Sequence, residues 1–173
     1  MASLPPTSAL RAFQATVTPN STPVSQVRFV VFGISHLTLA LPIVAVTKVV
    51  NLGTIEGSGQ SAWGVMTVDD RPCTVIDLHQ YLFHRPLNPD QAPHYLVLTA
   101  LATGELLGIP ASDTPRLIDV PSDLVRLLPS SYRKADTLAV ASHIAHWTDP
   151  ATEAEQTFFV LDVNSLMESQ AWW

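Results

Sequence analysis

Short apolar runs separated by turn signals are the feature of this sequence that most constrains its fold. The runs are rich in Val, Ile, Leu and Phe, and most are followed by Pro, Gly or Asp. The clearest are 27–32, 36–41, 61–68, 71–76, 95–100, 105–109, 115–120, 138–147 and 157–161. The pattern predicts about ten short strands in barrels or a sandwich, not a parallel nucleotide-binding sheet. Pro110, directly after one run, disfavours a central strand there.

Length and composition narrow the class of protein. The chain has 173 residues and no internal repeat, which suits one domain or one domain built of two halves. Hydrophobic residues make up 47% and charged residues 14%, values that favour a compact globule. The net charge of −6 and the absence of a basic run argue against a nucleic-acid partner.

One apolar stretch, Phe29 to Val50, is long enough to be considered as a membrane span. Polar residues, Pro42 and Lys48 interrupt it, and β-branched residues dominate it. Two buried strands and a bend explain the stretch better than a membrane helix. We expect residues 43–50 to form the bend or a short helical turn.

Few helices are predicted. Asp77 stands at an N-cap position before an apolar helical face, Ser122 is expected to cap a short helix over 122–128, and 163–169 reads as a closing helix. Residues 1–25 are rich in Pro, Ser and Thr and are expected to be a disordered leader. The folded domain is expected over residues 26–170.

The stretch TVDDRPCTVIDLHQYL, residues 67–82, looks at first like a catalytic cluster. Asp69 and Asp70 separate two strand-like runs, and short polar residues tolerate the left-handed backbone of a tight turn. With Asp77 as a helix cap, the acids are explained as a hairpin turn and a cap. Cys73 is the only cysteine, so it indicates a reducing environment and is expected to be a small core residue.

Other catalytic signals are weak. The chain has neither a GxxxxGK[ST] nor a GxGxxG phosphate loop. His143 and His146 lie three apart in a predicted strand, which places them on opposite faces and disfavours a metal pair. The catalytic alternative is a small hydrolase whose site combines His143, Ser61 and Asp119, although no local motif supports it.

Three motifs resemble the CheW-like adaptor domains of bacterial chemosensory signalling. They are Gly64 in the first strand of the hairpin, Val75-Ile76-Asp77-Leu78, and Leu161-Asp162 before the closing helix. Their order and separations make the resemblance fairly specific, and it extends over residues 27–167. It implies a mainly β fold of two small, intertwined, five-stranded SH3-like barrels around a shared apolar core, with a few short helices.

Two charged positions depart from the family pattern. The family's Val-x-Glu-Ile aligns with residues 46–49, so Lys48 replaces a glutamate. In the family's hairpin motif, Asp69 replaces an arginine. The exchange predicts a reversed salt bridge between two neighbouring positions, with drift at two solvated positions as the alternative. Because an exposed pair stabilises a fold by only about 0–1 kcal/mol, the exchange is of interest mainly for partner choice.

The resemblance implies a non-catalytic adaptor that couples methyl-accepting chemoreceptors to the regulatory domain of a CheA-type histidine kinase. It implies no cofactor, no metal and no direct membrane insertion, and a cytoplasmic location at receptor arrays. The partner-binding residues it suggests are Lys48, Val49, Val68, Asp69, Asp70 and Arg71. The changed hairpin leaves open a divergent barrel that binds another protein outside chemosensory arrays. Trp172 and Trp173 are expected to dock on the protein's own barrel, with docking into a partner as the alternative.

Overall fold

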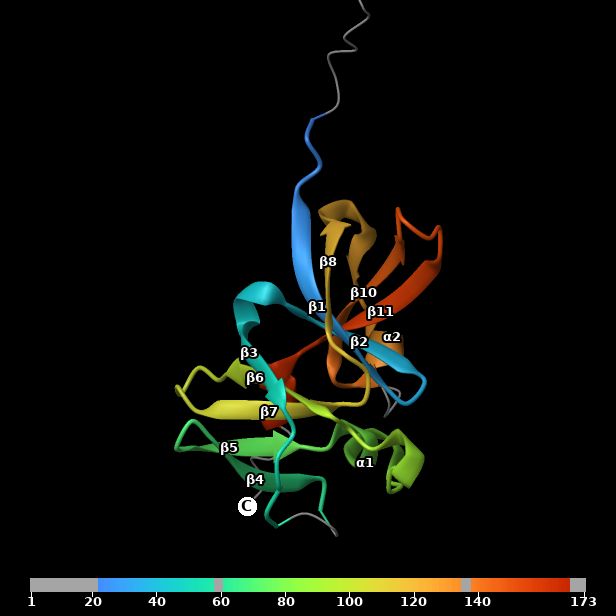
Figure 1. Ribbon diagram of the computed structural model, residues 1–173. Helices are drawn as coiled ribbons and strands as arrows, with labels where there is room; N and C mark the ends of the chain where they lie inside the picture. Colours follow the sequence, from blue (N-terminus) through green and yellow to red (C-terminus); the bar gives the residue numbers. More distant parts are fainter. Residues whose placement is uncertain (1–21, 58–60, 135–137, 169–173) are drawn as a thin grey trace, which may run out of the picture.

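The fold consists of two β-sheets, which lie one above the other in Figure 1. A computed structural model of the chain describes residues 22–57, 61–134 and 138–168. The upper sheet has the order β8 (Arg116–Pro121), β1 (Gln26–Ile34), β2 (Leu37–Pro42), β11 (Glu155–Leu161), β10 (Ala141–Thr148), β9 (Val125–Leu127). The lower sheet has the order β3 (Val46–Asn51), β6 (Tyr95–Ala100), β7 (Leu106–Ala111), β5 (Arg71–Ile76), β4 (Trp63–Val68).

The two sheets are intertwined along the chain. The first two strands and the last four build the six-stranded sheet, and the five strands between them build the other. Each sheet is antiparallel except for one pair, β11 with β2 and β5 with β7. The prediction of a mainly β fold with two β-sheet units and few short helices is therefore confirmed, with six strands instead of five in one unit.

Neither strand order closes on itself, so the units are curled sheets and not closed barrels. In the five-stranded sheet, β3 and β4 are the two edges, yet a short bridge brings the chain after β3 onto β4. Glu56 donates from its backbone N–H to the carbonyl of Val65 at 2.8 Å, and Val65 donates back at 2.9 Å. Strands β3 and β4 do not pair with each other, and these two hydrogen bonds link the chain after β3 to the β4 edge. The bridge thereby covers part of that edge.

Three clusters of buried side chains form the core. One lies inside each curled sheet, and the third fills the seam between the sheets. Strand β1 contributes to two of them, because Phe29 and Val31 face the interior of their own sheet while Val30 and Phe32 face the seam. Burial on both faces explains why the sequence of β1 shows a continuous apolar run and no alternation.

Short helices occur at the ends of strands. In α1 (Leu78–Phe83), the Asp77 carboxylate accepts a hydrogen bond from the backbone N–H of Gln80 at 3.1 Å, which confirms the predicted cap. The closing helix α3 (Val163–Glu168) confirms the prediction over its described residues. Further helical turns in the described part of the chain are η1 (Ile43–Ala45), η2 (Pro89–Gln91), η3 (Ser122–Leu124) and α2 (Ser130–Arg133).

The apolar stretch 29–50 folds as β1, β2, η1 and β3. The predicted bend is correct for Ile43–Ala45 only, because Val46–Asn51 pairs with β6 as a strand. The β-branched side chains of this segment fit a pleated surface, a preference that the sequence analysis overlooked after Pro42. Among the described residues, no helix combines the length and the hydropathy that crossing a bilayer requires.

The prediction of a helix over residues 122–128 is wrong. Only Ser122–Leu124 is helical, as a 3₁₀ turn, and Pro121, not Ser122, stands at its N-cap position without a side-chain hydrogen bond. Val125–Leu127 instead pairs with β10. Tertiary pairing overrides local helix propensity in this segment.

Pro110 lies inside β7, a central strand, although proline was expected to disfavour a central strand there. The pairing of β7 with β5 covers only Leu107 and Gly108, so Pro110 lies beyond that short ladder. A proline without an N–H is tolerated there because no ladder bond to β5 is required.

Gly108 is a position where β7 needs the smallest side chain. A Cβ atom built on Gly108 would lie 2.8 Å from Leu96 Cδ1 and 3.0 Å from Leu96 Cγ. Leu96 is fully buried in the core of the five-stranded sheet, so its side chain has no free space to move into.

We therefore expect Gly108→Ala to destabilise the protein by about 1–3 kcal/mol through overpacking. Urea unfolding monitored by circular dichroism measures the change. Gly53→Ala is the matched control, because its Cβ would approach only the flexible end of Met66, at 3.3 Å from Cε. Equal stability of the two variants would contradict the packing argument.

Candidate partner-binding surfaces

The β4–β5 hairpin ends in the tight turn that the sequence predicted. Asp69 and Asp70 have φ angles of +49° and +60°, the left-handed values of a two-residue hairpin turn. Val68 pairs with Arg71 directly beside the turn. The two carboxylates therefore project from the tip of a hairpin and do not face each other across a cleft, which removes the catalytic interpretation of this stretch.

Lys48 and Asp69 form the predicted reversed salt bridge. Lys48 lies on β3 and Asp69 at the tip of the β4–β5 hairpin, so the ion pair links the two edges of the five-stranded sheet. The side chains remain 38% and 72% exposed, respectively. Solvent therefore screens the pair, and its position on the surface matters more than its contribution to stability.

The six suggested partner-binding residues do not all reach the surface. Val49, Asp70 and Arg71 are exposed around the ion pair. Val68, however, is only 6% exposed and belongs to the core of the five-stranded sheet. Successive side chains of a strand point to opposite faces, and the Val68 side chain points into the sheet interior. It is therefore not available for contact with a partner.

An apolar groove of about 340 Å³ lies next to the ion pair. It separates β3 from β8, which are edge strands of the two different sheets. Leu117 on β8 is 60% exposed at this groove, and Ile43 and Val49 are also exposed. The lining residues are Val30, Ile43, Val46, Thr47, Lys48, Val49, Tyr95, Thr114, Pro115, Arg116 and Leu117.

Further apolar side chains are exposed in the segment from η3 to α2, which connects β8 to β10 along the chain. We call them the β9–α2 surface: Leu124, Leu127 and Tyr132, with Arg126 next to Leu127 in the sequence. Leu127 is 68% exposed and Tyr132 58%. The exposure of Leu127 was not predicted, because the apolar side of a helix over 122–128 would be expected to face the core.

The hydrolase alternative finds no support in the geometry. Asp119 is held by Arg28 in a two-pronged ion pair of 2.7 and 2.9 Å across β1 and β8. The hydrogen bond from Arg28 lowers the pKa of the Asp119 carboxyl. Ser61 accepts a hydrogen bond from the backbone N–H of Trp63, and His143 bonds its neighbour Ser142. The three residues thus have separate partners, and the structure shows no hydrogen bond between any two of them.

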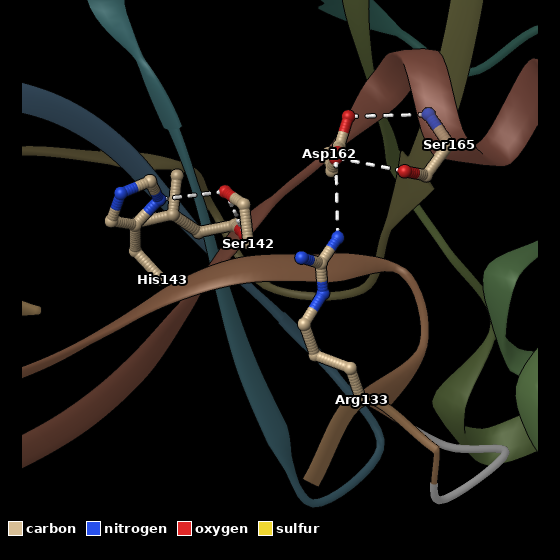
Figure 2. Close-up of polar contacts among 6 residues, drawn as sticks. Arg133, Ser142, His143, Asp162 and Ser165 are labelled. Atoms are coloured by element: carbon tan, nitrogen blue, oxygen red, sulfur yellow. Dashed lines mark hydrogen bonds and ion pairs between the residues drawn. The ribbon is translucent and has the colours of Figure 1, made fainter. Parts of the chain in front are cut away.

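Figure 2 shows another place where Ser, His and Asp occur together. His143 Nδ1 lies 2.8 Å from Ser142 Oγ, while Asp162 accepts from the Ser165 hydroxyl at 2.8 Å and lies 3.7 Å from Arg133. No contact joins His143 to Asp162 in the figure, so the relay that a serine nucleophile needs is missing. Asp162 instead caps α3 and links it to α2.

Among the described residues, no three His, Cys, Asp or Glu side chains are grouped to hold a metal ion. His143 and His146 bond different neighbours, Ser142 and Thr157. Cys73 is completely buried, and burial raises the pKa of its thiol. The surfaces described above are therefore the strongest candidates for function, and Trp172 and Trp173 lie outside the described residues.

Comparison with known proteins identifies the fold. A model of the CheW-like domain matches residues 28–171. The crystal structure of the scaffolding protein TtCheW from Thermoanaerobacter tengcongensis is similar, with a TM-score of 0.64 and 16% sequence identity over 83% of this chain and 89% of that one. A search of curated proteins found no match.

We expect Cys73 to resist thiol-specific reagents in the native protein, because its side chain is inaccessible and its thiolate is disfavoured. Labelling with a chromogenic disulfide at pH 8, with and without denaturant, measures the effect. Ser131→Cys, at an exposed position of α2, is the control and should label at once. Rapid labelling of native Cys73 would contradict the burial described here.

We expect the Lys48–Asp69 pair to contribute less than about 1 kcal/mol to folding, because both side chains are partly exposed. A double-mutant cycle of Lys48→Gln and Asp69→Asn in urea unfolding isolates the coupling. Arg71→Gln, at the exposed base of the same turn, controls for general effects of charge removal. A coupling above about 2 kcal/mol would show that the pair holds the sheet edges together.

Proposed function

The chain belongs to the CheW-like domain family, and on this premise we propose that it is a non-catalytic adaptor that couples chemoreceptors to a CheA-type histidine kinase. The observation that carries the proposal is the presence of two separate exposed apolar surfaces on one fold. One is the groove between β3 and β8, and the other is the β9–α2 surface.

Two surfaces suit an adaptor because it must hold two partners at once. Strands β8 and β9 are the two edge strands of the six-stranded sheet, and the turn η3 connects them along the chain. Leu117 and Leu127 expose apolar area that a bound partner would remove from water. Burial of each by a different protein would join the partners through one rigid sheet.

The exposed residues of the hairpin contribute selectivity in this proposal. Lys48 and Val49 line the groove, and Asp69 is bonded to Lys48. Asp70 and Arg71 extend the charged rim at the tip of the hairpin. Charges at the rim of an interface affect association rate and partner choice more than total affinity, because an incoming like charge is penalised.

The same proposal implies a cellular location and a mechanism for the protein. The protein would act in the cytoplasm at membrane receptor arrays, without inserting into the membrane itself. Its mechanism would be binding alone, and the separate bonding of Asp119, Ser61 and His143 supports a role without catalysis.

A second candidate function is a divergent family member that binds another protein outside chemosensory arrays. The observation in its favour is the reversed salt bridge at the hairpin, which changes the sign of the charge presented at two neighbouring surface positions. A protein of this kind would need only one of the two apolar surfaces.

Affinity capture with the full-length protein from its native lysate tests the two candidates. We expect a chemoreceptor and a histidine kinase to be captured together. Leu117→Asp should lose one of them by at least about tenfold and keep the other, because a charge in an apolar contact is strongly unfavourable. Leu127→Asp should show the opposite loss.

Val65→Asp is the matched control, because Val65 is exposed on β4 and belongs to neither surface. The exchange variant Lys48→Glu/Asp69→Arg should fold normally and capture a different amount of at least one partner. Capture of a single unrelated protein that depends on one surface alone would favour the second candidate. Absence of both receptor and kinase would refute the adaptor role.

A further inference from the structure

The charge of the β3–β8 groove contrasts with the charge of the whole protein. The chain has 15 acidic and 9 basic residues. Nevertheless, the two charged residues that line the groove, Lys48 on β3 and Arg116 on β8, are both basic. They lie on the two facing edge strands, so each wall of the groove carries one positive charge.

Lys48 is paired with the Asp69 carboxylate, whereas no carboxylate of the described residues pairs with Arg116. The Arg116 guanidinium donates to the neutral Gln156 amide oxygen at 3.1 Å. Asp69 is mostly exposed at the hairpin tip and is not part of the lining. Asp119, on the same strand as Arg116, is already bonded to Arg28.

We propose that the groove binds an apolar partner segment whose flanks carry aspartate or glutamate. Leu117, Val49 and Ile43 would take its apolar face, and Arg116, which bonds only the neutral Gln156 amide, would meet a carboxylate of its flank. This inference rests on the adaptor role proposed above and specifies the chemistry of one partner. Charge complementarity of this kind speeds association and rejects segments with basic flanks.

The sequence argues against the protein's own leader as the occupant. Residues 1–21 contain no Asp or Glu, and their one charged side chain is Arg11. The leader would therefore bring a third positive charge to the groove. A partner with acidic flanks fits the charges, whereas the leader does not.

Peptide selection tests the proposal without a known partner. A displayed library of random 16-residue peptides is selected against the full-length protein, and the flanking residues of the enriched peptides are counted. We expect enrichment of Asp and Glu over Lys and Arg around an apolar centre. Affinities of the best peptide are then measured by fluorescence anisotropy, as synthetic versions with Glu, Gln or Lys at the flanks.

Arg116→Glu should weaken binding of the Glu peptide by about tenfold or more and should favour the Lys peptide instead. Arg85→Glu, at an exposed arginine directly after the C-cap of α1, is the matched control and should change affinity less than about twofold. Leu117→Asp should abolish binding of all versions if they occupy the groove.

Each contrary result has a distinct meaning. Peptides that bind through Leu117 without any preference for acidic flanks would overturn the charge inference and leave the adaptor role standing. Peptides that ignore Leu117→Asp, or that a synthetic peptide of residues 1–21 displaces, would overturn the proposed occupant of the groove. The selected peptides could be acidic and depend on Leu117 while affinity capture finds neither receptor nor kinase. That combination would support this inference and refute the adaptor role.

Discussion

The apolar seam between the two sheets is the constraint on which the rest of the structure depends. Strand β1 contributes Val30 and Phe32 to the seam and Phe29 and Val31 to the interior of its own sheet. Across the seam, β7 contributes Leu107, Ile109 and Ala111. Because several strands are buried on both faces, neither sheet would keep its apolar surface out of water without the other. The two sheets are therefore expected to fold and unfold as one unit.

The seam also explains why the candidate surfaces exist. Packing the sheets together places the edge strand of one, β3, opposite the edge strand of the other, β8, and leaves a groove between them. Strand β9 is the other edge strand of the six-stranded sheet. Free strand edges are usually protected because they invite unwanted pairing. Retention of exposed leucines at both edges is understandable if partners cover them in the assembled state.

The Lys48–Asp69 ion pair is a weak interaction at a position where we propose that a partner binds. Its exposure limits its contribution to folding, and the Glu56–Val65 backbone bridge already links the same sheet edges. The pair lies at the rim of the groove, however, where charge is presented to whatever binds there. The effect of reversing its sign is therefore expected in partner selection and not in stability.

The sequence alone determined the strand pattern, the Asp69-Asp70 turn, the Asp77 cap and the burial of Cys73, because these depend on local conformational preference and on apolar periodicity. It also pointed to the proximity of Lys48 and Asp69, through the resemblance to a family. Only the tertiary structure decided that residues 125–127 form a strand, that Pro110 fits inside β7 and that Val68 faces the core. Each of these depends on residues that are distant in the sequence: β10 for residues 125–127, β5 for Pro110 and the core of the five-stranded sheet for Val68. The groove belongs to the same group, since its two walls come from strands nearly seventy residues apart that only the packed seam brings together.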